Sequence, residues 1–328
     1  MTITAQAIRF DEYGGSDVLN WTEVTLAAPQ AGEVLVRHKA VGLNYIDTYH
    51  RTGLYPVPAL PCTPGLEASG VIEAVGDGVE GLAVGDRVAY GTGPLGAYAT
   101  ARLIPADKLV RLPDQITHET AAAMMLKGLT AQYLLRQTFR VEAGQTILFH
   151  AAAGGVGLIA TQWAKHLGAT VIGTAGSEEK AELARAHGAD HVILYREQDV
   201  AEEVRRITDG KGVPVVYDGV GAATLDASLN SLSPRGLLVS YGNASGPITG
   251  FDLGILAAKG SLYITRPTLM GYADTQAAMQ AMADDLFAVV TGGHVSININ
   301  QRFELAKAAT AHDALEGRAT TGSTLLIP

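Results

Sequence analysis

The chain has 328 residues, a net charge of −9 and 47% hydrophobic residues. Its length exceeds the size at which one hydrophobic core stops growing, so we expect two domains. The acidic balance and the lack of any basic run argue against a nucleic-acid or anionic-membrane partner, because phosphate binding draws on clustered Lys and Arg.

The sequence contains one cysteine, Cys62. This excludes an intramolecular disulfide and a multi-cysteine zinc site, and it fits a reducing compartment. We interpret Cys62 as a small, partly buried filler. The N-terminal residues MTITAQAIRF lack the apolar core of a signal peptide, and no segment offers the roughly eighteen consecutive apolar residues of a membrane helix. We therefore expect a cytoplasmic protein.

The first third of the chain predicts a β-rich domain. Residues 5–41 alternate apolar and polar positions around turn residues, and 33–41 is the clearest strand. The next stretch, 42–56, is polar and aromatic, and we predict an irregular segment there rather than a core element. Two more strands are predicted at 68–76 and 85–90.

From residue 119 the composition changes to good helix formers, and a helix over 119–135 is predicted to cross between domains. Strands then alternate with helices, which is typical of a doubly wound parallel sheet. The predicted strands begin at Thr146, Thr170, His191, Val213 and Gly236, and the helices between them cover 178–187, 199–208 and 222–232.

The last part of the chain predicts a sixth strand at 259–264, one long amphipathic helix at 272–291 and a final strand at 323–327. We expect the C-terminus to return to the first domain. The predicted domains are therefore a discontinuous one, 1–125 with 268–328, and a dinucleotide-binding one, 126–267.

The stretch TILFHAAAGGVGLIATQWAKHLG, residues 146–168, has the strand, loop and helix order that a dinucleotide needs. Small residues permit a tight turn, close approach of backbone N–H groups to phosphates, and close packing of helix on strand. The competing interpretation is an ordinary tight turn before a helix. The predicted pyrophosphate loop consists of Ala152, Gly154, Gly155, Val156 and Gly157.

The end of the second strand bears on the choice of dinucleotide. NAD-binding folds place an acid there, on the ribose 2′-hydroxyl. Here Gly176 and Ser177 follow the strand, and Lys180 lies one helical turn further on. This favours NADPH, because the small residues leave room and the lysine supplies positive charge to a 2′-phosphate. Alternatively, Ser177 only caps the helix, or Glu178 turns back to the ribose and favours NADH.

Several stretches together resemble the medium-chain dehydrogenase/reductase superfamily, and within it the zinc-free quinone oxidoreductases related to zeta-crystallin. They are distributed over almost the whole chain. The matching stretches are GLNYIDTYHRTGLYP from Gly42, PGLEASGVIEAVG from Pro64, GDRVAY from Gly85, AAAGGVG from Ala151, VVYDGVG from Val215 and GSLYITRPT from Gly260. The resemblance implies a Rossmann-type domain plus a GroES-like β-rich catalytic domain.

The resemblance also accounts for missing zinc ligands. Zinc alcohol dehydrogenases of this superfamily have a metal-binding Cys where this chain has Asn44, and a metal-binding His where it has Leu66, beside the retained Glu67. Catalytic zinc needs about three protein ligands, so we predict no metal. The acceptor must then already be electron-poor, as a quinone or a conjugated enone is.

The resemblance places Asn44, Ile46, Asp47 and Tyr49 around the nicotinamide and the substrate, with Asn44, Asp47 and Tyr49 as the candidate catalytic residues. The alternative for Asn44 and Asp47 is stabilisation of their own loop. Lys127 and Thr130 match positions near the cofactor. Because Lys127 lies in an apolar run, it either reaches a polar partner or extends to solvent.

For the rest of the cofactor the resemblance implicates residues from three further segments. Tyr195 and Arg318 would lie at the adenosine end, although either could be an exposed surface residue. Along the nicotinamide half the resemblance implicates Tyr241, Gly242, Asn243, Thr265 and Arg266.

We therefore predict an NADPH-dependent quinone reductase that needs no metal and acts in a cleft between two domains. An enone or enoyl reductase on the same scaffold is the alternative. RNA binding or a structural, crystallin-like role is an alternative of another class, and the acidic charge disfavours RNA. The resemblance implies a homodimer or tetramer. Residues 261–264 would form the pairing edge if they end the sheet.

Overall fold

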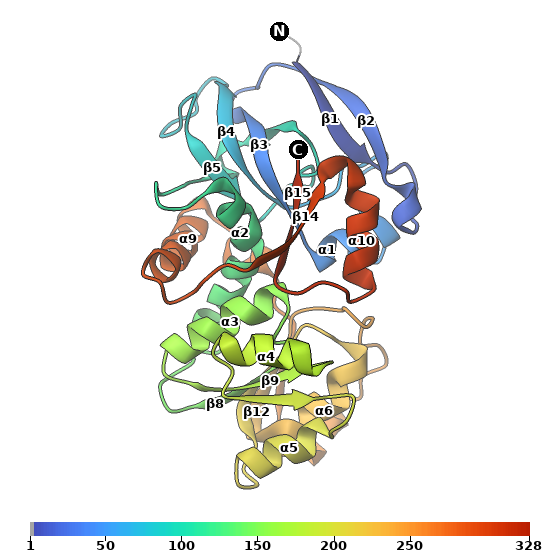
Figure 1. Cartoon of the computed structure of the whole chain (residues 1–328), viewed down its shortest axis with the longest axis vertical. Helices are drawn as coiled ribbons and strands as arrows, with labels where there is room; N and C mark the ends of the chain where they lie inside the picture. Colours follow the sequence, from blue (N-terminus) through green and yellow to red (C-terminus); the bar gives the residue numbers. More distant parts are fainter. Residues whose placement is uncertain (1–2) are drawn as a thin grey trace. The chain divides into compact units, whose positions relative to one another are not determined.

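The structure is a computed structural model that describes residues 3–328, and the chain divides into two units (Figure 1). The first unit comprises Met1–Leu129, Ala273–Thr291 and Ile297–Pro328. The second unit comprises Thr130–Tyr272 and Gly292–Ser296. No helix within residues 3–328 combines the length and apolarity needed to cross a membrane.

The second unit is built on a six-stranded parallel sheet with the order β10-β9-β8-β11-β12-β13. Its strands are β8 (Thr146–Phe149), β9 (Thr170–Ala175), β10 (His191–Leu194), β11 (Val213–Asp218), β12 (Leu232–Ser240) and β13 (Tyr263–Thr265). Strand order reverses at β8, as in dinucleotide-binding folds. The predicted Rossmann-type fold class is confirmed.

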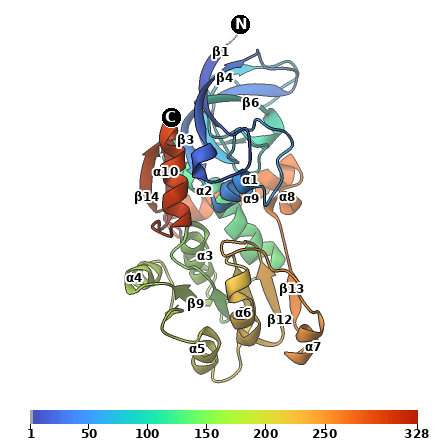
Figure 2. The ribbon, with the colours of Figure 1, turned by 90° about the vertical axis from the view of Figure 1, so that its right-hand side faces the viewer.

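Helices connect these strands, with α3 next to α4 and α5 next to α6 (Figure 2). The helices are α3 (Gly155–His166), α4 (Glu178–Ala186), α5 (Val200–Ile207), α6 (Leu225–Ser231), α7 (Gly254–Ala258) and α8 (Leu269–Tyr272), with a 3₁₀ turn η4 (Ala222–Thr224) and a π-turn η3 (Leu134–Thr138). The central strands are apolar on both faces, as a sheet covered on both sides requires; Leu148, Ile172 and Val216 are fully buried.

The first unit contains a seven-stranded sheet and a separate hairpin of β1 (Ile3–Arg9) and β2 (Asn20–Leu26). The sheet has the order β14-β15-β3-β4-β5-β7, and β6 pairs with β3. Its strands are β3 (Glu33–Leu43), β4 (Glu67–Val75), β5 (Arg87–Tyr90), β6 (Ala101–Pro105), β7 (Val110–Arg111), β14 (Ile299–Glu304) and β15 (Ser323–Ile327). The last strand of the chain is thus inserted beside β3, with Thr324 opposite Leu43.

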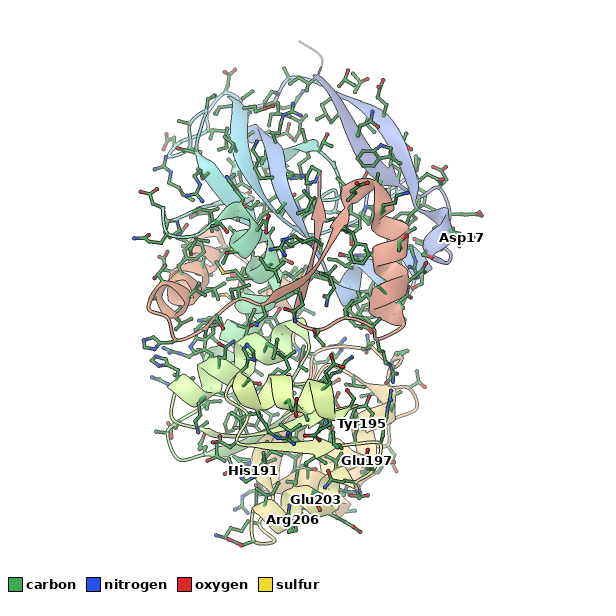
Figure 3. All side chains as sticks on the ribbon, in the orientation of Figure 1. Asp17, His191, Tyr195, Glu197, Glu203 and Arg206 are labelled. Carbon is green, nitrogen blue, oxygen red and sulfur yellow. The ribbon has the colours of Figure 1, made fainter. Side chains whose placement is uncertain are left out.

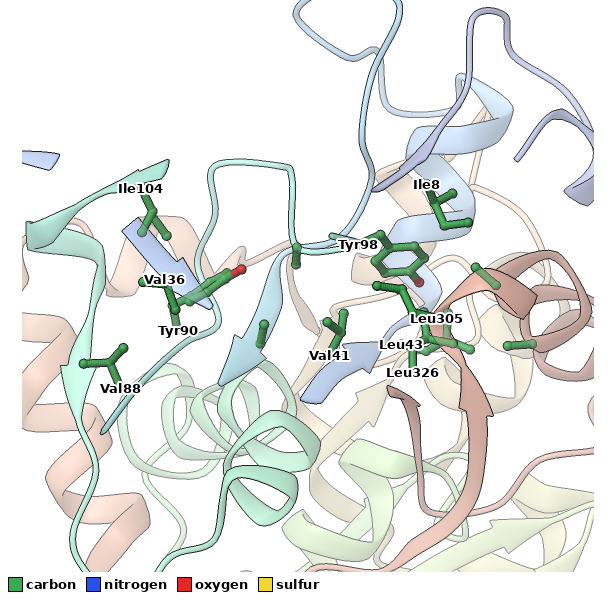
Figure 4. Close-up of a cluster of buried hydrophobic side chains, with 14 of the residues drawn as sticks. Ile8, Val36, Val41, Leu43, Val88, Tyr90, Tyr98, Ile104, Leu305 and Leu326 are labelled. Carbon is green, nitrogen blue, oxygen red and sulfur yellow. The ribbon is translucent and has the colours of Figure 1, made fainter. Parts of the chain in front are cut away.

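The helices of the first unit are α1 (Tyr45–Thr52), α2 (His118–Tyr133), α9 (Gln276–Thr291) and α10 (Ala308–Glu316), with 3₁₀ turns η1 (Ser16–Val18), η2 (Ala106–Lys108) and η5 (Leu305–Lys307). Helix α2 continues past Leu129 into the second unit. The core joins residues far apart in the sequence, and Figure 4 shows Leu43, Tyr98, Leu305 and Leu326 together.

One sequence prediction of secondary structure is wrong, and two predicted elements are present with shifted bounds. Residues 42–56 contain α1, whose inward side buries Tyr49 and Arg51. The sixth strand is shifted toward the C-terminus, because residues up to Leu262 form the turn that follows α7. The helix expected from residue 272 starts only at Gln276, because the Thr275 hydroxyl accepts a hydrogen bond from the Ala278 N–H and so caps a new helix.

Candidate functional site

In the first unit, the predicted site residue Asn44 lies at the junction of β3 and α1, where it caps the helix. Its side-chain amide donates to Glu67 Oε2 at 2.8 Å, and Lys127 Nζ donates to the same oxygen at 2.9 Å. The Leu126 backbone N–H donates to Glu67 Oε1 at 2.8 Å. Glu67 is fully buried, and Asn44 and Lys127 are nearly so. Lys127 therefore reaches a polar partner and does not extend to solvent.

Glu67 is the residue that sequence reasoning missed as the centre of this cluster. Its carboxylate fits because Gly42 has no side chain: a Cβ there would lie 2.1 Å from Glu67 Oε2 and 2.3 Å from the Ala122 carbonyl oxygen. The lysine in an apolar helix was the available signal, since a buried ammonium requires an anion. The result is a buried ion pair that fixes the orientation of the Asn44 amide.

Asp47 follows in the first turn of α1 and is fully buried. Its Oδ2 accepts hydrogen bonds from the Asn44 backbone N–H at 2.9 Å and from the Tyr98 hydroxyl at 2.9 Å. Within residues 3–328, Asp47 Oδ1 is buried without a hydrogen-bond partner. Burial raises the pKa of Asp47 to about 7, against the opposing effect of its hydrogen bonds. The buried Asp47 carboxylate thus holds the backbone of Asn44 in place.

A second buried network lies behind Asp47. The Tyr98 hydroxyl is 3.0 Å from His312 Nε2, and Arg51 Nη1 is 3.1 Å from His312 Nδ1. Arg51 also makes two hydrogen bonds of 2.9 Å to the carboxylate of Glu316. Burial lowers the pKa of His312 to about 3, so the ring is neutral. Arg51 donates to Nδ1, which leaves the Nε2 proton to point at Tyr98.

The other two predicted residues on α1 differ in exposure. Ile46 is half-buried, whereas Tyr49 is 9% exposed. The Tyr49 ring packs edge-on against Tyr55, with 5.2 Å between ring centroids. The Tyr45 ring is also near Tyr49, with a centroid distance of 6.4 Å. Tyr49 is thus part of an aromatic cluster on α1.

In the second unit, the predicted pyrophosphate loop joins β8 to α3. The first N–H groups of a helix have no intrahelical acceptor. Gly154 is the N-cap of α3, and no capping side chain accepts from these N–H groups. A Cβ at Gly157 would lie 2.4 Å from the Ala151 carbonyl oxygen. The loop is therefore a cradle of backbone N–H groups at the positive end of a helix, which fits a pyrophosphate.

The segment after β9 carries the residues predicted for the adenosine end. Ser177 is the N-cap of α4, and its hydroxyl accepts from the Lys180 backbone N–H at 3.4 Å. Glu178 Oε1 is paired with Arg185 Nη1 at 2.5 Å, on the same helix. Tyr195 follows β10 (Figure 3). It is 42% exposed, and its hydroxyl lies 2.6 Å from where a Cβ of Gly176 would be. Glu178 is thus engaged within α4.

The residues predicted for the nicotinamide half follow β12 and β13. The Tyr241 N–H donates to the Asp218 carbonyl at the end of β11, and Gly242 packs against the backbone of Gly219, beside Asn243. Arg266, just after Thr265, donates from Nη1 to the Ser240 carbonyl at 2.8 Å. These segments, the glycine loop and Gly176 all follow the carboxyl ends of parallel strands, where such sheets bind ligands.

The two remaining predicted residues lie on α2 and after α10. Thr130 is buried on α2, one helical turn after Lys127. Arg318 follows α10 in the first unit, has a φ of 58° and is exposed.

A family model described as alcohol dehydrogenase GroES-like domain matches residues 30–114, and one described as zinc-binding dehydrogenase matches residues 155–284. The chain is 59% identical to a quinone oxidoreductase of Pseudomonas aeruginosa, over 99% of this chain and 100% of that protein. The chain belongs to the quinone oxidoreductase family. The resemblance inferred from the sequence is confirmed.

Other members and neighbours extend this relationship. The crystal structure of Escherichia coli quinone oxidoreductase complexed with NADPH matches with a TM-score of 0.97 and 50% identity, over 98% of this chain and 100% of that chain. A 2-haloacrylate reductase of a Burkholderia species is 47% identical over 96% of both chains. Across residues 3–328, no group of three or more His, Cys, Asp or Glu side chains is arranged to hold a metal ion.

Proposed function

We propose that the chain is an NADPH-dependent quinone reductase that works without a metal. The observation that carries the proposal is the end-to-end relationship to quinone oxidoreductases, at 59% identity to the Pseudomonas protein. The uncapped start of α3 behind a small-residue loop supports dinucleotide binding. We assign cofactor binding to the second unit and the acceptor to the first.

The choice of NADPH rests on the end of β9. The strand ends at Ala175 without an acid, and the next carboxylate along the sequence, Glu178, is paired with Arg185. A ribose 2′-phosphate would meet Ser177 and Lys180 there rather than a carboxylate that repels it. Arg318 is the further candidate that the resemblance supplies. The E. coli relative was crystallised with NADPH, which supports the same assignment.

In the first unit we assign acceptor positioning to Asn44 and Tyr49. NADPH, when bound, supplies the hydride, so the protein has to orient a flat acceptor and exclude water. Tyr49 offers an aromatic face to a planar ring. Glu67 and Lys127 hold the Asn44 amide in one orientation, which fixes where it can hydrogen-bond an acceptor oxygen. Asp47 acts from behind, through the Asn44 backbone.

We also propose a homodimer in the cytoplasm. Strand β13 ends the parallel sheet, and Tyr263 on it is 60% exposed. Unpaired sheet edges are usually covered, and a second copy of β13 would cover this one. A single cysteine, Cys62, supports a reducing compartment.

A second candidate function is reduction of a conjugated carbon–carbon double bond. The 2-haloacrylate reductase supports it, because its named substrate is a conjugated acceptor and its identity of 47% extends over nearly the whole chain. Quinones and conjugated acids make the same electronic demand on a hydride donor.

The test is a panel of NADPH and NADH oxidation rates with simple quinones, enones, 2-haloacrylate and aldehydes, with and without chelator. We expect quinones to be the best acceptors, NADPH to be preferred, and chelator to have no effect. Faster turnover of enones or haloacrylate would favour the second candidate. Chelator-sensitive aldehyde reduction would contradict both.

A further inference from the structure

Four buried side chains outside the predicted site form a chain of hydrogen bonds at the carboxyl ends of β9, β8 and β11. They are Asp218, which ends β11, Ser228 on α6, His150 just after β8, and Thr174 on β9. Each is at most 2% exposed. The three strands are neighbours in the sheet, so this series of hydrogen bonds runs from strand to strand beneath the segments that follow them.

The direction of the protons can be assigned from the Asp218 end. A carboxylate only accepts, and Asp218 Oδ2 lies 2.7 Å from Ser228 Oγ, so the single Ser228 proton points at Asp218. The Ser228 oxygen, 3.0 Å from His150 Nε2, must then accept from the Nε2–H. Asp218 also accepts hydrogen bonds from the Thr224 hydroxyl and from the backbone N–H groups of Val220 and Gly221.

The hydrogen bonds continue from His150 through Thr174 to the glycine loop. Burial lowers the pKa of His150, so the ring is neutral and its Nδ1 is an acceptor. Thr174 Oγ1, at 3.2 Å, donates to this Nδ1. The Thr174 oxygen in turn accepts from the Ala151 N–H at 3.1 Å. Thr174, His150 and Ser228 each donate once toward Asp218 and accept once from the loop side.

Thr174, the last residue of this hydrogen-bonded series, holds the glycine loop at Ala151. Ala151 has a φ of 53°, in the left-handed region that non-glycine residues seldom adopt. Its carbonyl accepts from the Gly154 N–H at 2.9 Å. Thr174 also holds the next residue, because its carbonyl accepts from the Ala152 N–H at 3.0 Å. A change in the Ala151 conformation would therefore move the N–H groups that begin α3.

We propose that Asp218, Ser228, His150 and Thr174 act together as positioning residues that hold residues 151–157 in the conformation that receives the dinucleotide pyrophosphate. The inference rests on the proposed NADPH function. It assigns cofactor affinity to side chains that lie below the loop. Since the pyrophosphate is common to both dinucleotides, these four side chains should affect the binding of NADPH and NADH equally.

The test compares Thr174→Val, which keeps the shape and removes the hydroxyl, with Thr174→Ser, which keeps the hydroxyl. Dissociation constants for NADPH and NADH are measured by titration, together with kcat at saturating cofactor and Tm. We expect Thr174→Val to weaken both dinucleotides by about tenfold, as loss of a buried hydrogen bond would, with kcat within about twofold. Thr174→Ser should bind within about twofold of the original chain.

A second measurement does not depend on Thr174 alone. Ser228→Ala removes a link that is hydrogen-bonded to His150 and Asp218. Ser228→Ala should weaken NADPH binding in the original protein. It should have no added effect in the Thr174→Val background, since the series of hydrogen bonds is already broken there. Unaltered binding by Thr174→Val, equal binding of the Val and Ser variants, or fully additive effects would overturn the inference. Failure of the original chain to bind NADPH would overturn the proposed function as well.

Discussion

Asn44 is held through two different parts of its structure. Glu67 holds the side chain, and Asp47 holds the backbone N–H. The two acids differ in their own partners, because Glu67 has a buried cation and Asp47 has a phenol and an amide. Substitutions at the two acids should therefore have different consequences for stability.

Lys127→Met should lower the free energy of unfolding by about 3–5 kcal/mol, because it leaves Glu67 buried without its cation. Chemical denaturation without cofactor measures this. The double variant Lys127→Met/Glu67→Gln is the matched control, and it should recover part of the loss since neither charge remains. Equal stability of the single and double variants would contradict the importance of the buried pair.

The protonation of Asp47 should make stability depend on pH. Its pKa rises from 3.8 to about 7 on folding, so the folded state keeps a proton that the unfolded state releases. This contribution is complete below pH 4 and is lost as the pH rises to about 7. In Asp47→Asn the loss should vanish, so Tm relative to the original chain should improve between pH 4 and pH 7. A constant difference in Tm across that range would refute the shift.

Lys180→Ala tests the cofactor assignment at one residue. We expect KM for NADPH to rise by the equivalent of about 1–3 kcal/mol, because a charge-assisted contact to the 2′-phosphate is lost. KM for NADH, which lacks that phosphate, is the internal control and should barely change. If both values rose together, Lys180 would have another role.

At the scale of elements, the site depends on strand β3 having a glycine, Gly42, where the Glu67 carboxylate packs against it. Gly42→Ala would place a Cβ 2.1 Å from Glu67 Oε2 and against the Ala122 backbone. We expect a loss of about 1–3 kcal/mol or more of stability, with reduced turnover, because Glu67 must shift. Gly271→Ala is the matched control, since its nearest contact is Thr268 Oγ1 at an ordinary 3.6 Å. Similar effects of the two substitutions would contradict the packing argument.

The parallel sheet could be predicted from the sequence because each strand is a short apolar run followed by helix formers. Helix α1 was missed because its polar face dominates the sequence, while the residues it buries, Asp47 and Arg51, are types that usually indicate surface. The Asn44 and Asp47 pair, spaced as a capping box, was the available signal.

The polar networks of the site were largely beyond sequence reasoning. Asp47, Tyr98 and His312 form one hydrogen-bonded group although His312 lies more than two hundred positions from the other two. No local pattern marks such a group, because tertiary pairing brings it together. Lys127 was the one sequence signal of a buried polar partner, because it is an isolated charge in an apolar helix.

At the scale of the whole molecule, the proposed dimer can be tested at β13. Tyr263→Lys should shift the chain from dimer to monomer in sedimentation velocity, because a charge on a sheet edge opposes pairing. Val84→Lys is the control, since Val84 is 66% exposed in the first unit and lies outside this edge. A dimer that persisted in Tyr263→Lys would place the interface elsewhere.

The position of β15 has a consequence for synthesis of the protein. The strands of the second unit are complete once Thr265 has been made, but β3 has to wait for its partners Thr324 to Leu326, which are translated later. During this interval the chain exposes the edge of β3 that leads directly to Asn44. A growing chain can thus form its nucleotide-binding sheet first, and it can complete the sheet next to Asn44 only once Thr324 to Leu326 have been added.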